Sequence, residues 1–224
     1  MALSTVKDRP MLQGSTGPAG LSPDRGMRTL DILAATAALI FIAPLLLVLA
    51  IAVFAQDGKA PIYRQKRIGR GGKVFDCLKF RSMVPDAQER LEHLLANDPA
   101  ARREWAVDHK LRNDPRITPL GRFIRRTSLD ELPQLVNVIV GDMSLVGPRP
   151  IVQAETKRYG SYLQHYLKVR PGITGVWQVS GRNDVSYRRR IACDVLYARR
   201  RSFRKNLMIM FATVPAVLYS RGSY

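Results

Sequence analysis

Cysteine and histidine are scarce in this chain of 224 residues. The cysteines, Cys77 and Cys193, lie far apart and form no C-x-x-C motif, so the sequence indicates neither a disulfide framework nor a zinc site. The histidines at 93, 109 and 165 have no metal-binding spacing, and we assign them no role. This composition fits a reduced, cytosolic environment.

Acidic residues are also few, since 18 Asp and Glu stand against 36 Lys and Arg and the formal net charge is +18. Such an excess of basic residues indicates a polyanionic partner: nucleic acid, an anionic lipid surface or phosphorylated substrates. Charge alone leaves these three open. The length allows one sizeable domain with a membrane anchor.

One long apolar segment, residues 32–54, follows an N-terminal stretch rich in Ser, Gly and Pro. Residues 1–26 lack periodicity and are predicted to form a disordered tail. The apolar run of about 23 residues is long enough for a bilayer, which needs ~20. It lies too far from the N-terminus, and lacks the cleavage site, for an ordinary signal peptide.

Whether this segment spans the membrane depends on Pro44, which lies at its middle. A proline there removes a backbone N–H and is expected to kink or break the helix. Basic residues flank both ends, so the positive-inside rule does not place the ends on opposite sides. We predict a membrane-embedded, proline-broken helix over 27–58 and a cytoplasmic domain over 59–224, while a straight spanning helix stays open.

Two strands are predicted at 62–68 and 74–80, joined by glycines at 69–72. The glycines invite comparison with a phosphate-binding loop, but the spacing G-x-x-x-x-G-K-S/T is not met. A plain hairpin turn is therefore the better interpretation.

The remaining pattern is mainly helical. Helices are expected at 86–97, at about 98–111 with Asp98 as N-cap, and at about 151–167, with a strand-like piece at 173–179. Residues 187–205 predict an amphipathic helix whose basic face suits anionic membrane lipids. The apolar residues 207–219 are too few to span and are expected on the membrane or against the first helix.

Two adjacent carboxylates, Asp130 and Glu131, stand out between arginines. Ser128 is a good helix N-cap and an apolar run follows at 132–139, so we expect the carboxylates in the first turn of a helix. The helix dipole would favour their ionised state, which a nucleophile or a metal ligand requires.

Cations flank this turn, with arginines at 125 and 126 before it and Arg149 on a Pro-Arg-Pro corner after it. Cations around carboxylates suggest a phosphate bridged by a metal. Ser128 and Glu131 also fit a capping box, which is usually structural, and this alternative stays open. Pro133 complicates the box, because it would delete a hydrogen bond inside the helix.

Five motifs keep the order in which they occur in the bacterial sugar transferase family. They are residues 79–83 (KFRSM), 114–121 (DPRITPLG), 128–135 (SLDELPQL), 144–150 (SLVGPRP) and 170–175 (RPGITG). From about residue 28 to its end the chain resembles the monotopic phosphoglycosyl transferases, which start exopolysaccharide and related glycan assembly on a polyprenyl phosphate.

The resemblance implies an α+β, mostly helical fold: a re-entrant membrane helix hairpin and interfacial helices around a small catalytic core with a short β-hairpin. It implies transfer of hexose 1-phosphate from a UDP-hexose to undecaprenyl phosphate, with release of UMP, at the cytoplasmic face of the bacterial inner membrane. Family members often have Ser before the kink proline, whereas this chain has Ala43, which cannot bond a freed carbonyl.

The resemblance also implies roles for single residues. Asp130 would attack the sugar-linked phosphate and form a covalent intermediate, while Glu131 would hold Mg²⁺. Arg125 and Arg149 would clamp phosphate, with help from Lys79. Direct attack by the lipid phosphate, with Asp130 only as a metal ligand, stays open.

Two further contacts rest on the same resemblance. Lys79 and Arg81 alternate at a strand end, so both can point to the face that meets substrate, although basic residues there are more often solvated. Asp194 would be a substrate or metal-site carboxylate, or else it pairs with Arg190 one helical turn earlier.

The run at 177–184 (WQVSGRND) resembles members that use galactose or glucose, and we favour galactose. A membrane-tethered nucleic-acid binder would explain the charge but not the acidic turn between arginines, so no nucleic-acid partner is expected. A non-enzymatic scaffold for polysaccharide assembly remains the alternative. The sequence does not predict the oligomeric state.

Overall fold

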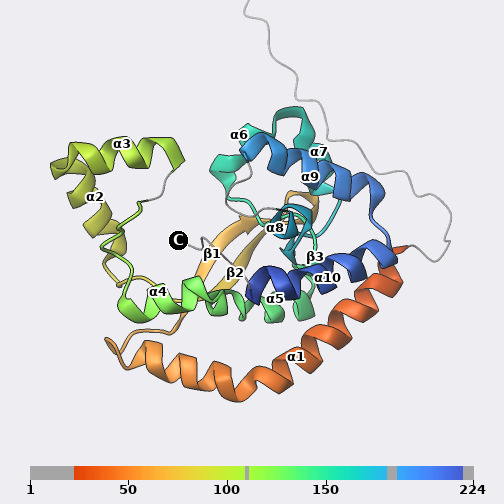
Figure 1. Cartoon of the computed structure of the whole chain (residues 1–224), viewed down its shortest axis with the longest axis horizontal. Helices are drawn as coiled ribbons and strands as arrows, with labels where there is room; N and C mark the ends of the chain where they lie inside the picture. The colour runs from red at the N-terminus through yellow and green to blue at the C-terminus, as the bar shows by residue number, and fades with distance from the viewer. Residues whose placement is uncertain (1–22, 109–110, 181–185, 219–224) are drawn as a thin grey trace, which may run out of the picture.

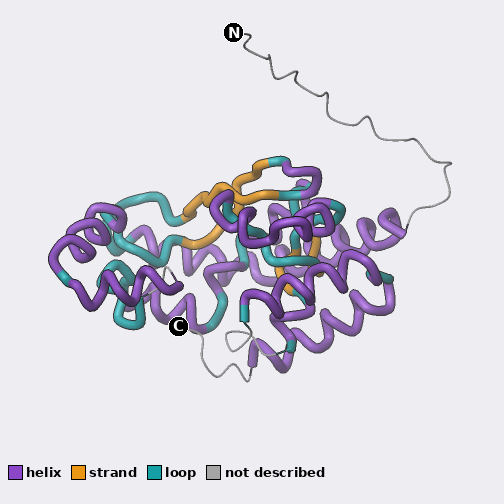
Figure 2. The backbone as a smooth tube through the Cα atoms, turned by 90° about the horizontal axis from the view of Figure 1, so that it is seen from above, coloured by secondary structure: helices purple, strands orange, loops and turns teal. Residues whose placement is uncertain are grey.

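The computed structural model describes residues 23–108, 111–180 and 186–218. This part is mostly helical with two small two-stranded sheets, so the predicted α+β class is confirmed. Figure 2 shows an elongated molecule, with the helices α2 (Ala87–Asn97) and α3 (Pro99–Asp108) at one end. Most of the predicted tail, and residues 181–184 of the run at 177–184, lie outside the described residues.

Helix α1 (Pro23–Phe54) begins inside the stretch predicted as tail and continues through Pro44. Figure 1 shows a bend near its middle rather than two separate helices. The expected break is therefore a bend, since proline removes only one hydrogen bond and the neighbouring turns keep theirs.

The outer surface of α1 is strongly apolar. Among the described residues it is the one helix long and apolar enough to cross a membrane, and only 11% of its most apolar window is buried within the protein. The large exposed apolar side chains are Ile32, Leu33, Ile40, Phe41, Leu45, Leu47, Val48, Ile51 and Phe54. A core helix of a soluble protein would bury these side chains, so this surface fits contact with lipid.

Both ends of α1 pack against the rest of the protein, which we call the body. Near its start, Arg28 donates hydrogen bonds of 2.6 and 2.8 Å to two carbonyls in the last turn of helix α5 (Gln134–Val140). Near its end, Leu49 and Val53 belong to a buried cluster with Phe80. The helix therefore lies along the body over most of its length (Figure 1).

Strands β1 (Ile62–Ile68) and β2 (Val74–Phe80) form the predicted antiparallel hairpin, closed by a short 3₁₀ turn at Arg70–Gly72. Arg67 pairs with Phe75 and Lys79 pairs with Tyr63. Because paired residues and positions two apart share a face of the sheet, Arg67 and Lys79 point to the same side.

The N-caps of α3 and of helix α4 (Pro119–Arg126) are formed by side chains. Asp98 accepts hydrogen bonds from the N–H groups of the next turn, at 2.8 and 3.1 Å, which confirms the predicted cap. Thr118 caps α4 in the same way, since its hydroxyl accepts from Gly121 N at 2.9 Å. The pair α2 and α3 projects from the body as an arm (Figure 1).

A second, parallel sheet pairs β3 (Ser144–Val146) with β4 (Gly172–Thr174), followed by the short helix α8 (Val176–Val179). The chain between the two strands was expected to form one helix, but it forms four short turns: η3 (Gln153–Glu155), α6 (Thr156–Tyr159), η4 (Gly160–Tyr162) and α7 (Leu163–Leu167). Gly160, at φ 50° and ψ −132°, lies at the junction of α6 and η4, and this conformation, which glycine adopts readily, interrupts the helix.

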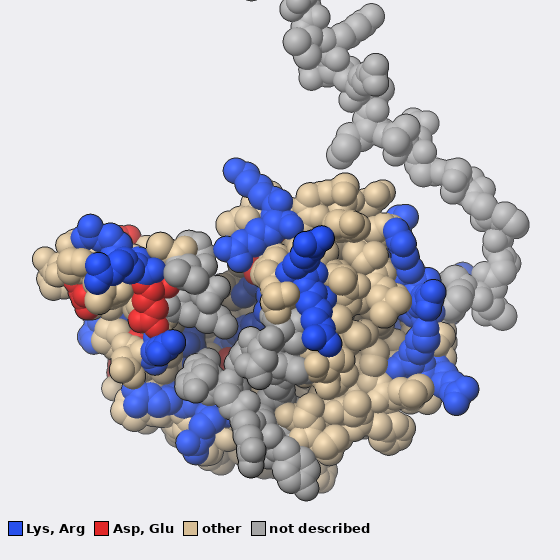
Figure 3. Space-filling model, turned by 45° about the horizontal axis from the view of Figure 1, so that its top comes forward, with Lys and Arg blue, Asp and Glu red and all other residues tan. Residues whose placement is uncertain are grey.

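The basic helix predicted over 187–205 ends earlier than expected, and its last residues join the following apolar stretch in a second helix. Helix α9 (Tyr187–Arg200) ends at the extended residue Arg201, and α10 (Phe203–Leu218) follows. Figure 3 shows Lys and Arg side chains in several groups separated by uncharged surface, while the acidic ones lie mainly at the α2 and α3 end. Helix α10 exposes Phe203, Met208, Phe211 and Val214.

The central core lies between α1, the hairpin and α5. Its buried side chains come from all three and from the segment after α5: Ala35, Phe75, Cys77, Leu135, Val138 and Met143. Burying a large apolar side chain contributes roughly 1.5–3 kcal/mol. The predicted anchor thus shares its core with the predicted catalytic domain.

Candidate active site

The two adjacent carboxylates lie in a turn between α4 and α5. Asp130 and Glu131 belong to a 3₁₀ turn (Leu129–Glu131), and α5 starts only after Pro133, which cannot donate an N–H to the turn before it. Ser128 has φ 58° and its side chain makes no cap hydrogen bond. The predicted N-cap and the capping box are therefore wrong.

Asp130 is almost fully buried, with 9% of its surface exposed. Burial and repulsion from Glu131 raise the pKa of Asp130 to about 6, although Lys79, Arg125 and Arg149 oppose the shift. The expected effect of a helix dipole on Asp130 is thus outweighed by desolvation. At neutral pH most Asp130 is still ionised, and a poorly solvated carboxylate suits a nucleophile.

Glu131 has the opposite pKa shift. Its Oε1 atom lies 2.8 Å from Lys79 Nζ and 3.6 Å from an Arg149 nitrogen. Burial acts against ionisation of Glu131, but the cations outweigh it and lower its pKa to about 2. The surroundings therefore shift the pKa values of these two neighbouring carboxylates in opposite directions, which is typical of sites in which two carboxylates have different roles.

A small pocket opens beside Glu131. Its charged lining consists of Arg67, Lys79 and Arg149 against Glu131. Three cations facing one carboxylate leave an excess of positive charge, which suits an anion such as a phosphate.

Lys79 is held in position by Asn137, which ties strand β2 to α5. The Asn137 side chain accepts from Leu78 N at 2.9 Å and donates to Asp76 O at 2.7 Å. A buried amide that is bonded at both ends fixes the strand against the helix that follows the carboxylate turn.

Arg125 reaches the site from α4. Its Nε atom donates to Ser82 Oγ at 2.7 Å, and its charge is close enough to Asp130 to influence the pKa of that carboxyl. The structure thus brings together Asp130 and Glu131 with Lys79, Arg125 and Arg149, all from the predicted set.

Arg81 does not join this group. Its guanidinium is paired with Asp57, with Nη2 2.6 Å from Oδ1, and its Nε donates to Ala60 O at 3.0 Å. It therefore holds the loop after α1 and does not face the carboxylates, because the chain leaves the strand after Phe80 and the alternation of faces ends there.

Asp194 is also placed elsewhere. It is 3% exposed on α9 and accepts a hydrogen bond from Tyr159 Oη at 2.7 Å. The alternative pairing with Arg190 is not formed, since Arg190 instead lies 4.0 Å from Glu155 and stacks on Trp177. Asp194 is a buried partner of Tyr159 rather than part of the carboxylate turn.

Replacing Asp194 by Asn is expected to flatten the pH dependence of stability. Burial raises the pKa of Asp194 to about 7, so the folded protein binds the extra proton that the unfolded chain releases near pH 4. Stability is therefore lost as pH rises from about 4 to about 7 in the wild type, by on the order of 4 kcal/mol at most. An amide can still accept from Tyr159 but does not titrate.

Thermal unfolding in detergent between pH 5 and 8 measures this effect. The Asn variant should gain stability relative to the wild type as pH rises, while Asp142→Asn, at a partly exposed carboxylate, should follow the wild type. Parallel curves for Asp194→Asn and the wild type would show that Asp194 keeps one protonation state.

Two residues near the site were not predicted from the sequence. Arg67 lines the pocket, and Ser82 binds Arg125. Ser82 lies within the family-like run 79–83, which could have indicated it. Arg67 had one available signal, its position on the same strand face as Lys79, but it is one of many basic residues in this chain.

No cluster of three or more His, Cys, Asp or Glu side chains able to hold a metal occurs among the residues that the structure describes. Mg²⁺ sites that act on phosphates often use only one or two carboxylates, with water and substrate oxygens as the other ligands. Asp130 and the Oε2 atom of Glu131, which is not the oxygen that contacts Lys79 and Arg149, fit that smaller donor set.

Comparison with known proteins identifies sequences similar to this chain. Residues 24–220 match the model of the family described as bacterial sugar transferase. The chain is 54% identical over 197 residues to an undecaprenyl-phosphate galactose phosphotransferase of Salmonella typhimurium, covering 88% of this chain and 41% of that protein. It is 51% identical over 197 residues to a UDP-galactose-lipid carrier transferase of Erwinia amylovora, again covering 88% and 41%.

The chain thus spans less than half the length of these two relatives. With the exopolysaccharide production protein ExoY of Rhizobium meliloti it is 49% identical over 197 residues, which cover 88% of this chain and 87% of that protein. The family model covers the carboxylate turn, the flanking cations and nearly all of α1. On these grounds the chain belongs to the bacterial sugar transferase family.

Proposed function

We propose that this protein transfers hexose 1-phosphate from a UDP-hexose to undecaprenyl phosphate and releases UMP, as the first step of exopolysaccharide assembly. The observation that carries the proposal is the pair of adjacent carboxylates with opposite pKa shifts, Asp130 and Glu131, beside a pocket with a cationic excess. The names of the Erwinia and Salmonella relatives combine galactose with a lipid carrier or undecaprenyl phosphate, which supports the substrate class.

In the proposed first step, an Asp130 oxygen attacks the sugar-linked phosphorus. The bond from this phosphorus to the bridging oxygen breaks, UMP leaves with that oxygen, and the sugar phosphate remains on Asp130 as an acyl phosphate. In the second step an oxygen of undecaprenyl phosphate attacks the same phosphorus and releases the Asp130 carboxylate. Two substrates from different phases can thus use one site in turn.

The other residues make this approach of anions feasible. Lys79 and Arg149 hold Glu131 and face the pocket, and Arg125 stands near Asp130, so the charges of the diphosphate meet cations. Mg²⁺, held by Glu131 when bound, would further neutralise the phosphate oxygens. Direct attack by the lipid phosphate, without an acyl phosphate, is the alternative mechanism.

The proposed location is the bacterial inner membrane, with the catalytic part on the cytoplasmic side. The exposed apolar face of α1 would lie in the bilayer, and the fact that both ends of α1 pack on one body favours a re-entrant anchor. The exposed apolar residues of α10 and the basic residues of α9 would rest on anionic lipids.

The donor sugar is proposed to be galactose, with glucose as the second candidate. The Salmonella and Erwinia relatives carry galactose in their names, while a relative from Caulobacter vibrioides, 36% identical, is named as a glucose-1-phosphate transferase. The residues described near the carboxylates would bind phosphate rather than the sugar in this proposal, so the choice of galactose rests on these relatives.

UMP release by the membrane-bound protein tests the proposal. Undecaprenyl phosphate, Mg²⁺ and one UDP-sugar at a time are supplied, and we expect release with UDP-galactose or UDP-glucose that depends on the lipid. No release with any donor, under conditions in which a related transferase is active, would favour a non-enzymatic assembly scaffold.

A further inference from the structure

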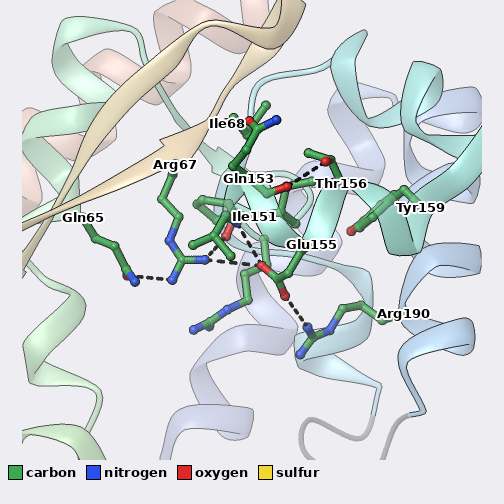
Figure 4. A network of polar contacts seen from close by, with 12 residues as sticks. Gln65, Arg67, Ile68, Ile151, Gln153, Glu155, Thr156, Tyr159 and Arg190 are labelled. Atoms are coloured by element: carbon green, nitrogen blue, oxygen red, sulfur yellow. Dashed lines mark hydrogen bonds and ion pairs between the residues drawn. The ribbon is translucent and has the colours of Figure 1, made fainter. Parts of the chain in front are cut away.

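Arg67 lines the pocket, and it is the charged lining residue to which the proposed reaction assigns no role. It lies near the end of β1, and its guanidinium donates from Nη1 to Pro150 O at 2.8 Å and from Nη2 to Gln65 Oε1 at 2.6 Å. Nη1 also lies 3.6 Å from Glu155 Oε2. Figure 4 shows Arg67 between Gln65 and Glu155, so three contacts fix the plane of this side chain.

The carbonyl that Arg67 binds belongs to the Pro148–Pro150 corner, which carries Arg149. On the near side of the corner, backbone hydrogen bonds tie Gly147 N to Thr174 O and Gly172 N to Pro148 O, each at 2.8 Å. These bonds fix the start of the corner against strand β4 but leave its end to other contacts.

Beyond the corner, the chain is tied to β1 instead. Ile68 N donates to Ile151 O at 2.9 Å, and Tyr166 Oη donates to Ile68 O at 2.6 Å. The corner is thus held by hydrogen bonds on both sides. Among them, the Arg67 bond to Pro150 O involves the residue directly after Arg149. Arg149 in turn reaches Glu131.

Glu155 supplies the counter-charge that makes this arrangement stable. Two arginines, Arg67 and Arg149, lie near one another in the pocket and repel, and burial of Arg67 adds to the cost. Glu155 offsets that cost, and it also accepts from Val152 N at 2.9 Å and approaches Arg190. The planar guanidinium of Arg67, 12% exposed, makes directional contacts to several groups at once, which suits it to fix the geometry of its neighbours.

We propose that Arg67 is a positioning residue: it fixes the Pro148–Pro150 corner so that Arg149 stays at Glu131 and faces the phosphates of the substrate. This inference rests on the proposed function, in which Arg149 contacts phosphate. Arg67 acts through Arg149, and its planar guanidinium is required because one side chain must bond Pro150 O, Gln65 and Glu155 together.

The first test compares Arg67→Lys with Arg67→Gln in the UMP release assay. Displacing a binding group by about 1 Å can cost roughly 10²-fold in rate, and we expect both variants to lose kcat/KM on that scale. Lys keeps the charge but cannot make the three contacts. The exposed residue Arg64, on the opposite face of the same strand, provides the control Arg64→Gln, which should match the wild type.

The outcomes of this comparison are distinct. An Arg67→Lys variant close to the wild type would overturn the proposal and make Arg67 one more charge for the phosphate. If the Arg67 variants fail to fold, Gln65→Ala removes one of the three contacts without touching the pocket lining, and we expect a loss of about tenfold. Unchanged activity of Gln65→Ala in that case would also overturn the proposal.

A double-mutant cycle separates positioning from a general structural role. Because Arg67 acts through Arg149, adding Arg67→Gln to Arg149→Gln should lower kcat/KM by less than about twofold further. If the two losses multiply, Arg67 acts independently of Arg149 and the proposal is wrong. The unfolding temperatures of the wild type, the two single variants and the double variant are measured as well, but the coupling is calculated from kcat/KM alone.

Failure of the proposed function is recognised separately. If the wild type releases no UMP with any donor, the same cycle is measured as binding of inorganic pyrophosphate with Mg²⁺, which requires only the cationic pocket. Non-additive losses of pyrophosphate binding would then support the positioning role, and additive losses or unaltered binding would overturn it.

Discussion

Asp130→Asn is expected to abolish UMP release, with a loss of at least roughly 10³-fold, as is usual when a nucleophile is removed. The amide has nearly the shape of the carboxylate but cannot attack phosphorus. Because Asp130 is buried and its charge is poorly solvated, the substitution should leave the unfolding temperature unchanged or raise it. Loss of activity in a protein of unchanged stability would therefore show that Asp130 is needed for the reaction and not for the fold.

The covalent step has its own measurement. Wild-type protein given a UDP-sugar labelled in the sugar, without lipid acceptor, should retain one label per chain on the peptide that contains Asp130. Adding undecaprenyl phosphate should discharge it. Asp130→Asn should retain none, and Asp142→Asn, which changes a partly exposed carboxylate paired with Lys73, should behave as the wild type.

An active wild-type enzyme that never retains label would contradict the acyl-phosphate intermediate. The reaction would then be a direct transfer in a complex of both substrates, with Asp130 as a metal ligand. Full activity of Asp130→Asn would contradict both mechanisms and exclude the carboxylate turn as the site.

Gly121→Ala is expected to destabilise the protein by about 3 kcal/mol or more, at the upper end of what overpacking costs. A methyl group at Gly121 would lie 1.9 Å from Ser82 O and 2.7 Å from Ser82 C, which is a clash with backbone. The Ser82 carbonyl cannot move freely, because it accepts from Thr118 N at 3.2 Å. Helix α4 must therefore shift, and it carries Arg125.

Thermal unfolding and UMP release are measured together for this variant. We expect a lower unfolding temperature and, in the fraction that stays folded, weaker catalysis, because Ser82 no longer holds Arg125 near Asp130. Gly26→Ala is the matched control, since a methyl group there would meet nothing within 4 Å. Wild-type stability and activity of Gly121→Ala would show that α4 moves away at little cost.

The elements predicted best are those determined by neighbours in sequence. Alternation of side chains and the glycines at 69–72 predicted the hairpin over the observed residues, 62–68 and 74–80. The Asp98 cap also needs only the turn that follows it. The carboxylate turn was misplaced because two local signals conflict: Ser128 favours a helix start, whereas Pro133 delays it.

Contacts between distant residues account for the other differences. Asp194 binds Tyr159, which is 35 positions away, rather than Arg190 four positions away, and no local pattern distinguishes these partners. Arg81 was expected beside Lys79, but its guanidinium binds Asp57 in the loop after α1 instead. The site residues Asp130, Glu131, Lys79, Arg125 and Arg149 were predicted through a resemblance of motifs, and their spatial grouping agrees with it.

The packing of α1 has a consequence for how the protein is made. Ala35 and Val53, near the two ends of its apolar run, are fully buried against residues that follow the helix in the chain. In the proposed membrane setting, insertion and completion of the catalytic fold are then a single event, because the core is unfinished until the helix is in place. A nascent chain whose α1 has not packed on the residues that follow it would have no closed core, so in the proposed setting active enzyme would form at the membrane surface that carries its lipid substrate.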